Sequence, residues 1–246
     1  MLTRRTVGRL GLALLSGLPL AGCGYPTYRI RYRSKLVVND HGVVRSGIGV
    51  VEFQVHDHSK SFLGNSGLVS QSRGAAAFVA LQSGGVAAVS LDSFRGRNQV
   101  GSRPMAPDSY DPSSVFENAP QGDDVWRDGR NEAYERLIRN APAHPVTVSR
   151  TIAPPLLFFR DRLDPTSVVS IDLSRPEAEI DDGVLFQSLT LQITTDEPSF
   201  DPIYQTMPWL RGLAAAGVML DGSQIRYTNN LSNLIGAEAL VRENFL

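Results

Sequence analysis

The chain is poor in cysteine, because Cys23 is the only one among its 246 residues. A disulfide, a cysteine zinc site and a thiol nucleophile are therefore not expected. The chain also lacks a charge excess, with 24 Lys and Arg against 25 Asp and Glu, which argues against a nucleic-acid-binding protein. After residue 22 no apolar run is long enough for a membrane-spanning helix. Glycine-rich phosphate loops and a G-x-S-x-G elbow are absent too.

The first 22 residues have the composition of an export signal. A basic segment with Arg4, Arg5 and Arg9 precedes the apolar residues 10–20, and small residues follow. The sequence Leu20-Ala21-Gly22-Cys23 resembles the lipobox of bacterial lipoproteins. The resemblance implies that the leader is cut before Cys23, that the Cys23 thiol receives a diacylglyceryl group, and that the new amine is acylated. Two or three acyl chains hold a protein stably on a bilayer.

Two further features of the leader concern its route and destination. Arg4-Arg5 also fits a twin-arginine signal, so general secretion and folded export both stay open. By analogy with lipoproteins, an Asp after the cysteine would favour the inner membrane, and this position holds Gly24. We therefore expect a lipid-anchored envelope protein that faces the periplasm, with the outer membrane favoured. Residues 23–246 would carry 21 basic and 25 acidic side chains, a net charge of −4.

Two hairpins are predicted at residues 27–92. Residues 28–38 alternate strictly, with Tyr28, Ile30, Tyr32, Leu36 and Val38 on one face, which is typical of an amphipathic strand. Residues 39–42 are expected to form a turn with Gly42 in a left-handed conformation, and residues 43–55 are expected to form the second strand of the hairpin. Gly47 and Gly49 indicate a bulge or a close backbone approach. A second hairpin joins residues 70–81 to 86–91, and its alanines indicate tight packing under another layer.

The remaining chain predicts a mixed architecture. Residues 93–122 form a long loop without periodicity, and a helix follows at 123–140. Strands are expected at 146–149, 156–159, 168–171 and 184–194, the last with Leu185, Leu189, Leu191 and Ile193 on one face. A helix is expected at 202–216, a short strand at 225–227 and a helical turn at 236–243. We therefore predict one α+β domain over residues 23–246, an antiparallel β meander with a few helices packed on it.

Several of these segments are similar to a group of uncharacterised exported proteins of Gram-negative bacteria. The similar segments are residues 28–32 with 42–47, 159–161 with 164–168, 189–194 and 208–210. They reach both ends of the part that follows Cys23. The resemblance implies a shared structure and no activity, since the segments read as a hairpin, a turn, a strand and a helix.

Candidate chemical sites are few. His56 and His58 point to the same side of a strand and supply two potential metal ligands, but no third ligand is evident. Acidic residues gather at Asp161/Asp164, Asp181/Asp182 and Asp196/Glu197/Asp201 without a calcium-loop spacing. Trp126 and Trp209 lie on predicted helices and are expected to anchor the core. No catalytic residue, resident metal or cofactor is predicted.

The basic face of the first strand is the remaining candidate. Arg29, Arg31, Arg33 and Lys35 follow Cys23 by six to twelve residues, so they could contact anionic headgroups. The alternative is a solvated sheet face whose charges discourage edge pairing. We expect a non-catalytic lipoprotein that contacts another envelope component. A periplasmic ligand-binding domain with a cleft under loop 93–122, and a metal-assisted hydrolase at His56 and His58, are the alternatives.

Overall fold

The computed structural model describes residues 27–57, 68–93, 108–109, 144–150, 153–174 and 179–244. Its two longest strands form the N-terminal hairpin. β1 (Thr27–Asp40) pairs along its whole length with β2 (Val43–Asp57). His41 and Gly42 connect them with φ angles of 53° and 86°, and the Gly42 N–H donates to Asn39 Oδ1 at 2.7 Å. A two-residue turn with positive φ at both positions matches the twist of the strands. The predicted hairpin and the left-handed Gly42 are confirmed.

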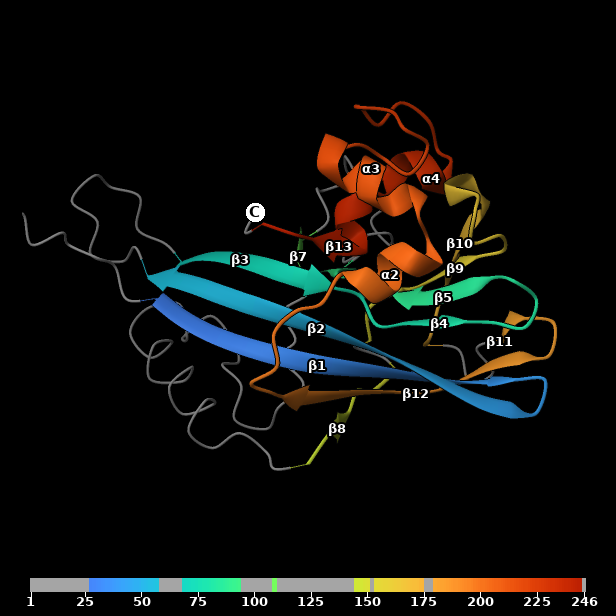
Figure 1. Ribbon diagram of the computed structural model, residues 1–246, viewed down its shortest axis with the longest axis horizontal. Coiled ribbons are helices and arrows are strands. Elements are labelled where there is room, and N and C mark those ends of the chain that lie inside the picture. Colours follow the sequence, from blue (N-terminus) through green and yellow to red (C-terminus); the bar gives the residue numbers. More distant parts are fainter. Residues whose placement is uncertain are drawn as a thin grey trace, which may run out of the picture.

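The hairpin lies in the middle of a large antiparallel sheet (Figure 1). Its order is β11-β12-β1-β2-β3-β13. The short strand β8 pairs with β12 on the edge that faces away from β1. The added strands are β3 (Leu68–Ala75), β8 (Val146–Thr147), β11 (Glu179–Asp181), β12 (Val184–Ile193) and β13 (Val241–Arg242). The meander β1-β2-β3 and the antiparallel pairing agree with the prediction, although strands contribute more of this fold than helices.

A second sheet contains β4 (Phe78–Ala80), β5 (Val86–Val89), β9 (Leu156–Phe159) and β10 (Val168–Ile171), in the order β10-β9-β5-β4. The prediction of one continuous strand at residues 70–81 is wrong, because the chain leaves the large sheet at Ala76 and Ala77 and enters the second sheet as β4. Both alanines are buried, so nothing in their hydropathy marks the crossing. A separate pair joins β6 (Asp92–Ser93) to β7 (Asp108–Ser109).

Gly47 and Gly49 allow this crossing. A Cβ atom on Gly47 would lie 1.5 Å from the carbonyl oxygen of Phe78, and one on Gly49 would lie 2.4 Å from the carbonyl oxygen of Ala75. The backbone of β2 therefore touches the backbone of the segment that joins β3 to β4. The predicted close approach is confirmed, and it requires residues without a side chain at these two positions.

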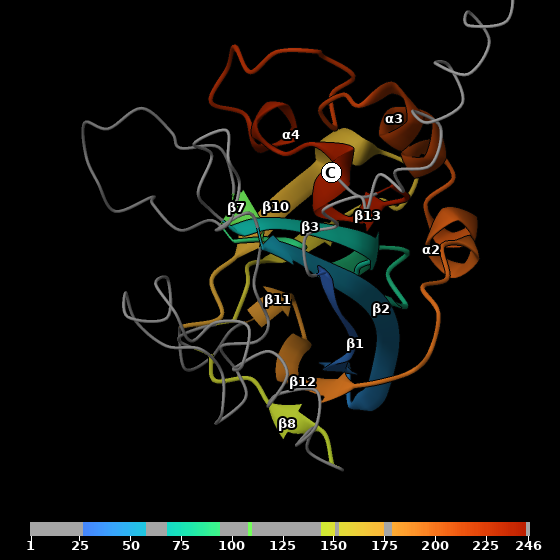
Figure 2. The same ribbon diagram turned by 90° about the vertical axis from the view of Figure 1, so that its left-hand side faces the viewer.

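The two central strands of the second sheet, β5 and β9, are buried on both faces, as their uninterrupted apolar sequences require. Ala87, Val89, Leu156 and Phe158 pack toward the inner face of the large sheet. Their neighbours in sequence pack instead against the C-terminal helices: Val86, Ala88, Leu157 and Phe159. The helical layer comprises α2 (Asp201–Thr206), α3 (Trp209–Ala216), α4 (Leu231–Leu234) and the 3₁₀ turns η3 (Pro165–Ser167) and η4 (Ala237–Ala239), as Figure 2 shows.

The C-terminal predictions need correction. The helix expected at 202–216 is two helices, because Pro208 lacks an N–H and disfavours helical geometry at Met207, which has φ −126° and ψ 80°. The strand expected at 225–227 is a loop. At 236–243 the expected helical turn is η4, but the segment continues as the short strand β13. The helix predicted at 123–140 lies outside the described residues.

The predicted apolar face of β12 is also partly wrong. Leu189 and Leu191 are buried, but Leu185 is 44% exposed, while Val184 and Phe186 point into the core. The register between β1 and β12 shifts between Val37 and Val38. A bulge of this kind adds one residue to a strand and exchanges the faces of all residues beyond it. An alternation counted through the bulge therefore assigns Leu185 to the wrong face.

Candidate functional site

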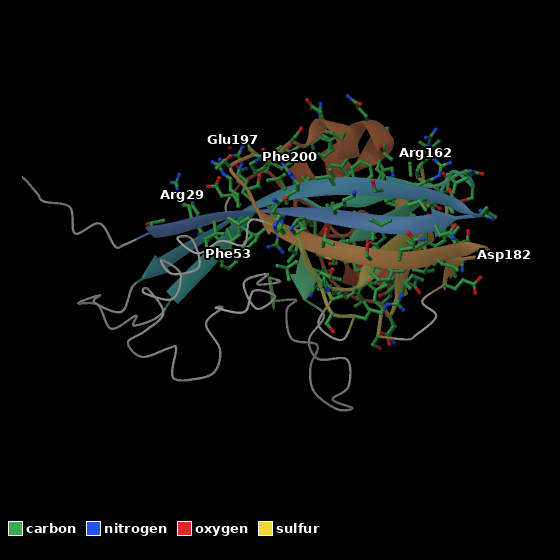
Figure 3. The ribbon with its side chains drawn as sticks, turned by 90° about the horizontal axis from the view of Figure 1, so that it is seen from below. Arg29, Phe53, Arg162, Asp182, Glu197 and Phe200 are labelled. Carbon is green, nitrogen blue, oxygen red and sulfur yellow. The ribbon has the colours of Figure 1, made fainter. Side chains whose placement is uncertain are left out.

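The basic residues of β1 line the outer face of the large sheet. Ile30, Tyr32 and Leu36 point into the core, so the odd-numbered Arg29, Arg31, Arg33 and Lys35 share the opposite face, as predicted. Figure 3 shows Arg29 and the buried Phe53 on opposite sides of the sheet. Residues two apart on a strand are about 7 Å apart. The arginines therefore form an evenly spaced row that begins near the start of β1.

A segment distant in sequence crosses this row. Residues 194–200, here called the strap, run from the end of β12 to the start of α2 (Figure 1). The Thr194 N–H donates to the Arg31 carbonyl at 3.0 Å, which extends the pairing of β12 with β1 by one bond. At the other end of the strap, the guanidinium of Arg73 lies over the Phe200 ring at 5.7 Å. The strap thus spans the sheet from β12 to β3.

The strap supplies acidic partners for the arginine row. Arg33 donates to Asp196 Oδ2 through Nε at 3.1 Å and also through Nη2. Arg31 Nη1 lies 2.7 Å from Glu197 Oε1. The hydrogen bonds from Arg33 lower the pKa of Asp196, so its carboxylate stays charged. The Asp196 and Glu197 side chains are 46% and 70% exposed, so water competes for these contacts.

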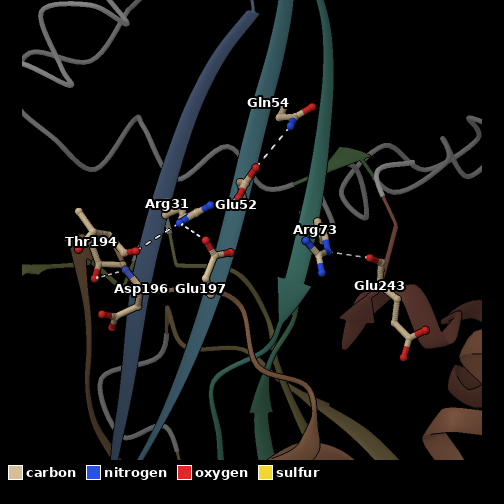
Figure 4. A network of polar contacts seen from close by, with 9 residues as sticks. Arg31, Glu52, Gln54, Arg73, Thr194, Asp196, Glu197 and Glu243 are labelled. Carbon is tan, nitrogen blue, oxygen red and sulfur yellow. Dashed lines mark hydrogen bonds and ion pairs between the residues drawn. The ribbon is translucent and has the colours of Figure 1, made fainter.

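Arg31 also has a buried partner on β2 (Figure 4). Its Nε donates to Glu52 Oε2 at 2.7 Å, and only 4% of the Glu52 side chain is exposed. Burial alone would raise the pKa of Glu52, but the hydrogen bond and the charge of Arg31 outweigh burial and hold the pKa below its usual value. The Arg31–Glu52 pair is therefore a fixed part of the sheet, in contrast to the exposed contact with Glu197.

Arg29 has a different kind of partner. The Gln54 amide lies between Glu52 and Arg29. In one orientation it donates to Glu52 Oε1 at 3.3 Å, and after a half-turn its oxygen accepts from Arg29 Nε at 2.8 Å. Among the described residues the Arg29 guanidinium thus faces a neutral amide and has no ion pair like that of Arg33 with Asp196, although its charge helps to lower the pKa of Glu52.

An open groove of about 710 Å³ follows the first three arginines. It lies beside the part of β1 that precedes Tyr32, where the pairing with β12 begins. The lining residues come from β1, the end of β12 and the strap: Arg29, Ile30, Arg31, Arg33, Ile193, Thr194, Thr195 and Asp196. We call this feature the arginine groove. Its guanidinium groups and threonine side chains match the chemistry of an anionic, oxygen-rich ligand.

The opposite end of the same outer face has a different character. Val44 and Ile48 on β2 and Leu185 on β12 are 63%, 53% and 44% exposed. Val44 and Leu185 flank Asn39 of β1, because both pair with it from opposite sides. We call these three aliphatic residues the distal patch. The predicted apolar face of β12 would have hidden Leu185, so sequence reasoning missed this surface.

Two buried ionic clusters serve the fold. Asp40 is fully buried at the end of β1, 2.7 Å from Arg45 Nε, and it accepts from the Gln82 N–H at 2.8 Å. Burial opposes ionisation there, but contacts with His41, the Gln82 N–H and Arg45 lower the pKa of Asp40. These contacts tie the end of the hairpin to the β4–β5 turn.

The second cluster joins the C-terminal strand to the sheet. Arg242 on β13 donates to Asp92 and to Ser72 on β3. Burial raises the pKa of Asp92 to about 6, although the charge of Arg242 acts in the opposite direction. Neither residue stood out in the sequence, because their partners are 150 and 170 positions away.

The candidate metal residues are only partly within the described structure. His56 lies on β2 opposite Thr27 and Val69, whereas His58 lies outside the described residues. Within the described residues, no group of three His, Cys, Asp or Glu side chains could hold a metal ion. The metal hypothesis at His56 and His58 thus gains no third ligand from the described part of the chain.

Two of the three acidic clusters have structural contacts. Asp164 accepts from the Thr166 N–H at 2.8 Å and caps η3, while Asp196 and Glu197 bind the arginine row. Trp209 packs on Phe159 with ring centroids 5.5 Å apart, as a core anchor should. Cys23, the lipobox residues Leu20, Ala21 and Gly22, Trp126 and nearly all of loop 93–122 lie outside the described residues.

Comparison of the chain with models of protein families, with curated proteins and with solved structures finds no match. The described residues include no helix with the length and hydropathy needed to cross a bilayer.

Proposed function

We propose that this protein is a lipid-anchored, non-catalytic component of the bacterial envelope that holds a protein-binding face away from the membrane. The anchor is Cys23, which precedes β1 by four residues. Four extended residues reach at most about 14 Å, so a lipid on Cys23 keeps the start of β1 close to the bilayer. The proposal places the domain in the periplasm, with the outer membrane favoured.

The proposal rests on the difference between the two ends of the outer sheet face, one cationic and the other aliphatic. The arginine row begins at the end of β1 nearest Cys23, and the distal patch surrounds Asn39 near the other end. Ten residues separate Arg29 from Asn39, which corresponds to about 33 Å of strand. Cationic side chains near a bilayer gain attraction from anionic lipids, whereas exposed aliphatic side chains on a sheet face favour protein contact. The two ends therefore suit two different neighbours.

The anchor is tested by the intact mass of the membrane-fractionated protein beside a Cys23→Ala control. We expect the mass of residues 23–246 with acyl chains, and we expect the control to lack both cleavage and lipid. Separation of inner and outer membranes then gives the location. An unmodified mass that retains residues 1–22 would refute the lipoprotein assignment.

The binding face is tested by photo-crosslinking in cells. A photoreactive amino acid at Ile48 or Leu185 should give a defined adduct with one envelope protein. The same probe at Gln205, an exposed residue of α2, is the matched control. The Val44→Asp variant should abolish the adduct and leave the melting temperature unchanged, because Val44 is exposed. Equal adducts from all three positions would contradict a specific face.

One observation favours a ligand-binding domain as a second candidate. An apolar cavity of about 40 Å³ lies between the two sheets, lined by Tyr32, Ser34, Val51, Ser72, Val89, Ser90, Leu91, Pro154, Leu189 and Leu191. A small apolar ligand that raises the melting temperature should lose this effect when Val51 is enlarged to Phe. Equal stabilisation of both variants would exclude this cavity as the site.

A further inference from the structure

We propose that the arginine groove is a binding site for a phosphate ester, and that Asp196 and Glu197 of the strap are the internal anions that the phosphate displaces. The inference rests on the proposed function for the source of the phosphate, a lipid headgroup, and its chemistry also admits free phosphate. It adds a ligand class and an internal competitor to the expectation of general attraction to the membrane.

The spacing of the groove suits a tetrahedral anion. Arg29, Arg31 and Arg33 project from one face at intervals of about 7 Å. Guanidinium groups at that distance are able to reach different oxygens of one phosphate, and each offers a planar pair of donors. Thr194 and Thr195 line the same groove and supply further polar groups. The groove is open to solvent, which suits a headgroup that remains attached to a bilayer.

The charges in the groove are unequally compensated. The Arg31–Glu52 bond ends on a buried carboxylate, so it is less exposed to competing water than the contacts with the strap. Within the described part of the chain, the ion-pair partner of Arg33 is Asp196 and the second carboxylate at Arg31 is Glu197, both on the exposed strap. Arg29 faces the neutral Gln54 amide. When the two strap carboxylates move aside, Arg29 and Arg33 provide two uncompensated charges for a phosphate.

The exposed strap contacts are weak enough to be displaced. Ion pairs between solvent-exposed side chains contribute little, because water and salt compete with them. The same carboxylates occupy donors that a phosphate would use. Removing the strap charges should therefore raise the affinity for phosphate. General surface attraction would also raise it, but only in proportion to the change in net charge.

The test compares variants within the full chain carrying Cys23→Ala, so that no protein is lipid-anchored and the leader is the same in all of them. Binding is measured by sedimentation with two kinds of vesicle. One contains phosphatidylcholine alone, and the other contains phosphatidylcholine and phosphatidylglycerol in equal amounts. The Arg29→Gln variant should lower the preference for phosphatidylglycerol by clearly more than about fivefold, because about fivefold is the effect of one basic residue near a charged surface without a specific contact. Lys35→Gln is the matched control, since it removes the same charge from the same face of β1 outside the groove lining.

The strap is tested with variants that remove its negative charges. D196N/E197Q should bind phosphatidylglycerol vesicles several-fold more tightly, whereas Asp201→Asn should change binding less per charge removed. In vesicles with oleate in place of phosphatidylglycerol the net negative charge is on carboxylates, and the Arg29→Gln effect should fall there to that of Lys35→Gln. Equal losses for Arg29→Gln and Lys35→Gln, or an unchanged affinity of D196N/E197Q, would overturn the proposal.

A second arm identifies the source of the phosphate. Inorganic phosphate is titrated against the same variants, with the melting temperature as the readout. Stabilisation that depends on Arg29, without vesicle preference, would assign the site to free phosphate and overturn the headgroup source. Vesicle preference without phosphate stabilisation would support the headgroup. Loss of both would refute the site, while the acylation of Cys23, measured separately by mass, would still test the proposed function.

Discussion

The crossing of β2 with the segment between β3 and β4 permits a sharp test of the fold. The change is Gly47→Ala. The new Cβ would lie 1.5 Å from the Phe78 carbonyl oxygen and 2.5 Å from the carbonyl carbon. Since carbon and oxygen atoms rest at about 3.3 Å or more, the two backbones would have to separate by about 2 Å. Neither group is the end of a flexible side chain, so rotation of a side chain offers no relief.

The cost follows from what the separation disturbs. Ala77 and Val79 flank Phe78 and pack into the core between the sheets with Leu36, and a shift of about 2 Å would open that core. Overpacking usually costs about 1–3 kcal/mol, and a clash between two backbones should exceed this range. We expect a loss of at least about 4 kcal/mol, or roughly 10 °C in melting temperature for a domain of this size.

Thermal and urea unfolding followed by circular dichroism measure the effect. The matched control is Gly212→Ala, because a Cβ there meets nothing within 4 Å and Gly212 lies within α3. Alanine is favoured over glycine in a helix by about 1 kcal/mol, so the control should melt at a higher temperature. A Gly47→Ala protein that melts within a few degrees of the unmodified protein would refute the backbone contact.

Three further predictions concern polar groups. Asp92→Asn should flatten the pH dependence of stability: burial raises the pKa of Asp92 to about 6, above its unfolded value of 3.8, so the Asp92 contribution is fully present below pH 3.8 and is lost as the pH rises through 6. Urea midpoints from pH 4 to 7 measure this, and parallel profiles would contradict it. Asn233→Ala should cost about 2–4 kcal/mol, since the buried amide accepts from the Tyr227 and Thr228 N–H groups and donates to Ser223 and Ile225, and proteolysis should then cut this loop faster. Trp209→Phe should cost about 1 kcal/mol through loss of the 2.7 Å bond to the Arg162 carbonyl, and an unchanged melting temperature would show that water replaces this bond.

Local pattern was sufficient wherever a strand stays in one sheet without interruption. The alternation at 28–38 located β1 and its buried face, and the apolar runs at 156–159 and 168–171 coincide with β9 and β10. Gly42 marked the hairpin turn because a positive φ suits glycine. In each case neighbours within a few residues determine the conformation, so a single sequence contains the information.

Pattern failed where tertiary contacts decide the conformation. The crossing at Ala76 and Ala77 depends on two glycines in a different strand. The residues at 225–227 favour a strand by composition, yet Asn233 holds this segment in a loop through hydrogen bonds with the backbone of Ile225, Tyr227 and Thr228 and with the Ser223 hydroxyl. The bulge that exposes Leu185 lies in the pairing with β1, and neither strand reveals it alone.

The candidate site divides in the same way. The shared face of Arg29, Arg31, Arg33 and Lys35 follows from the period of a strand and was predicted. The acidic strap was not, because Asp196 and Glu197 meet the arginines only after β12 pairs with β1, more than 160 positions away in sequence. Read locally, the row is a strongly basic surface, but in the folded protein Arg31 and Arg33 contact the three carboxylates of Glu52, Asp196 and Glu197.

This compensation bears on how the arginine row should be interpreted. A row kept only to discourage edge pairing would need no acidic partners, and a row kept only for membrane attraction would be weakened by them. One carboxylate, Glu52, is buried and fixed, whereas Asp196 and Glu197 are exposed and lie on a connecting segment. Buried pairs fix structure, and exposed pairs exchange readily with water or with another anion. The arrangement therefore separates an ion pair to a buried carboxylate, within the paired strands β1 and β2, from exposed ion pairs that a ligand is able to replace.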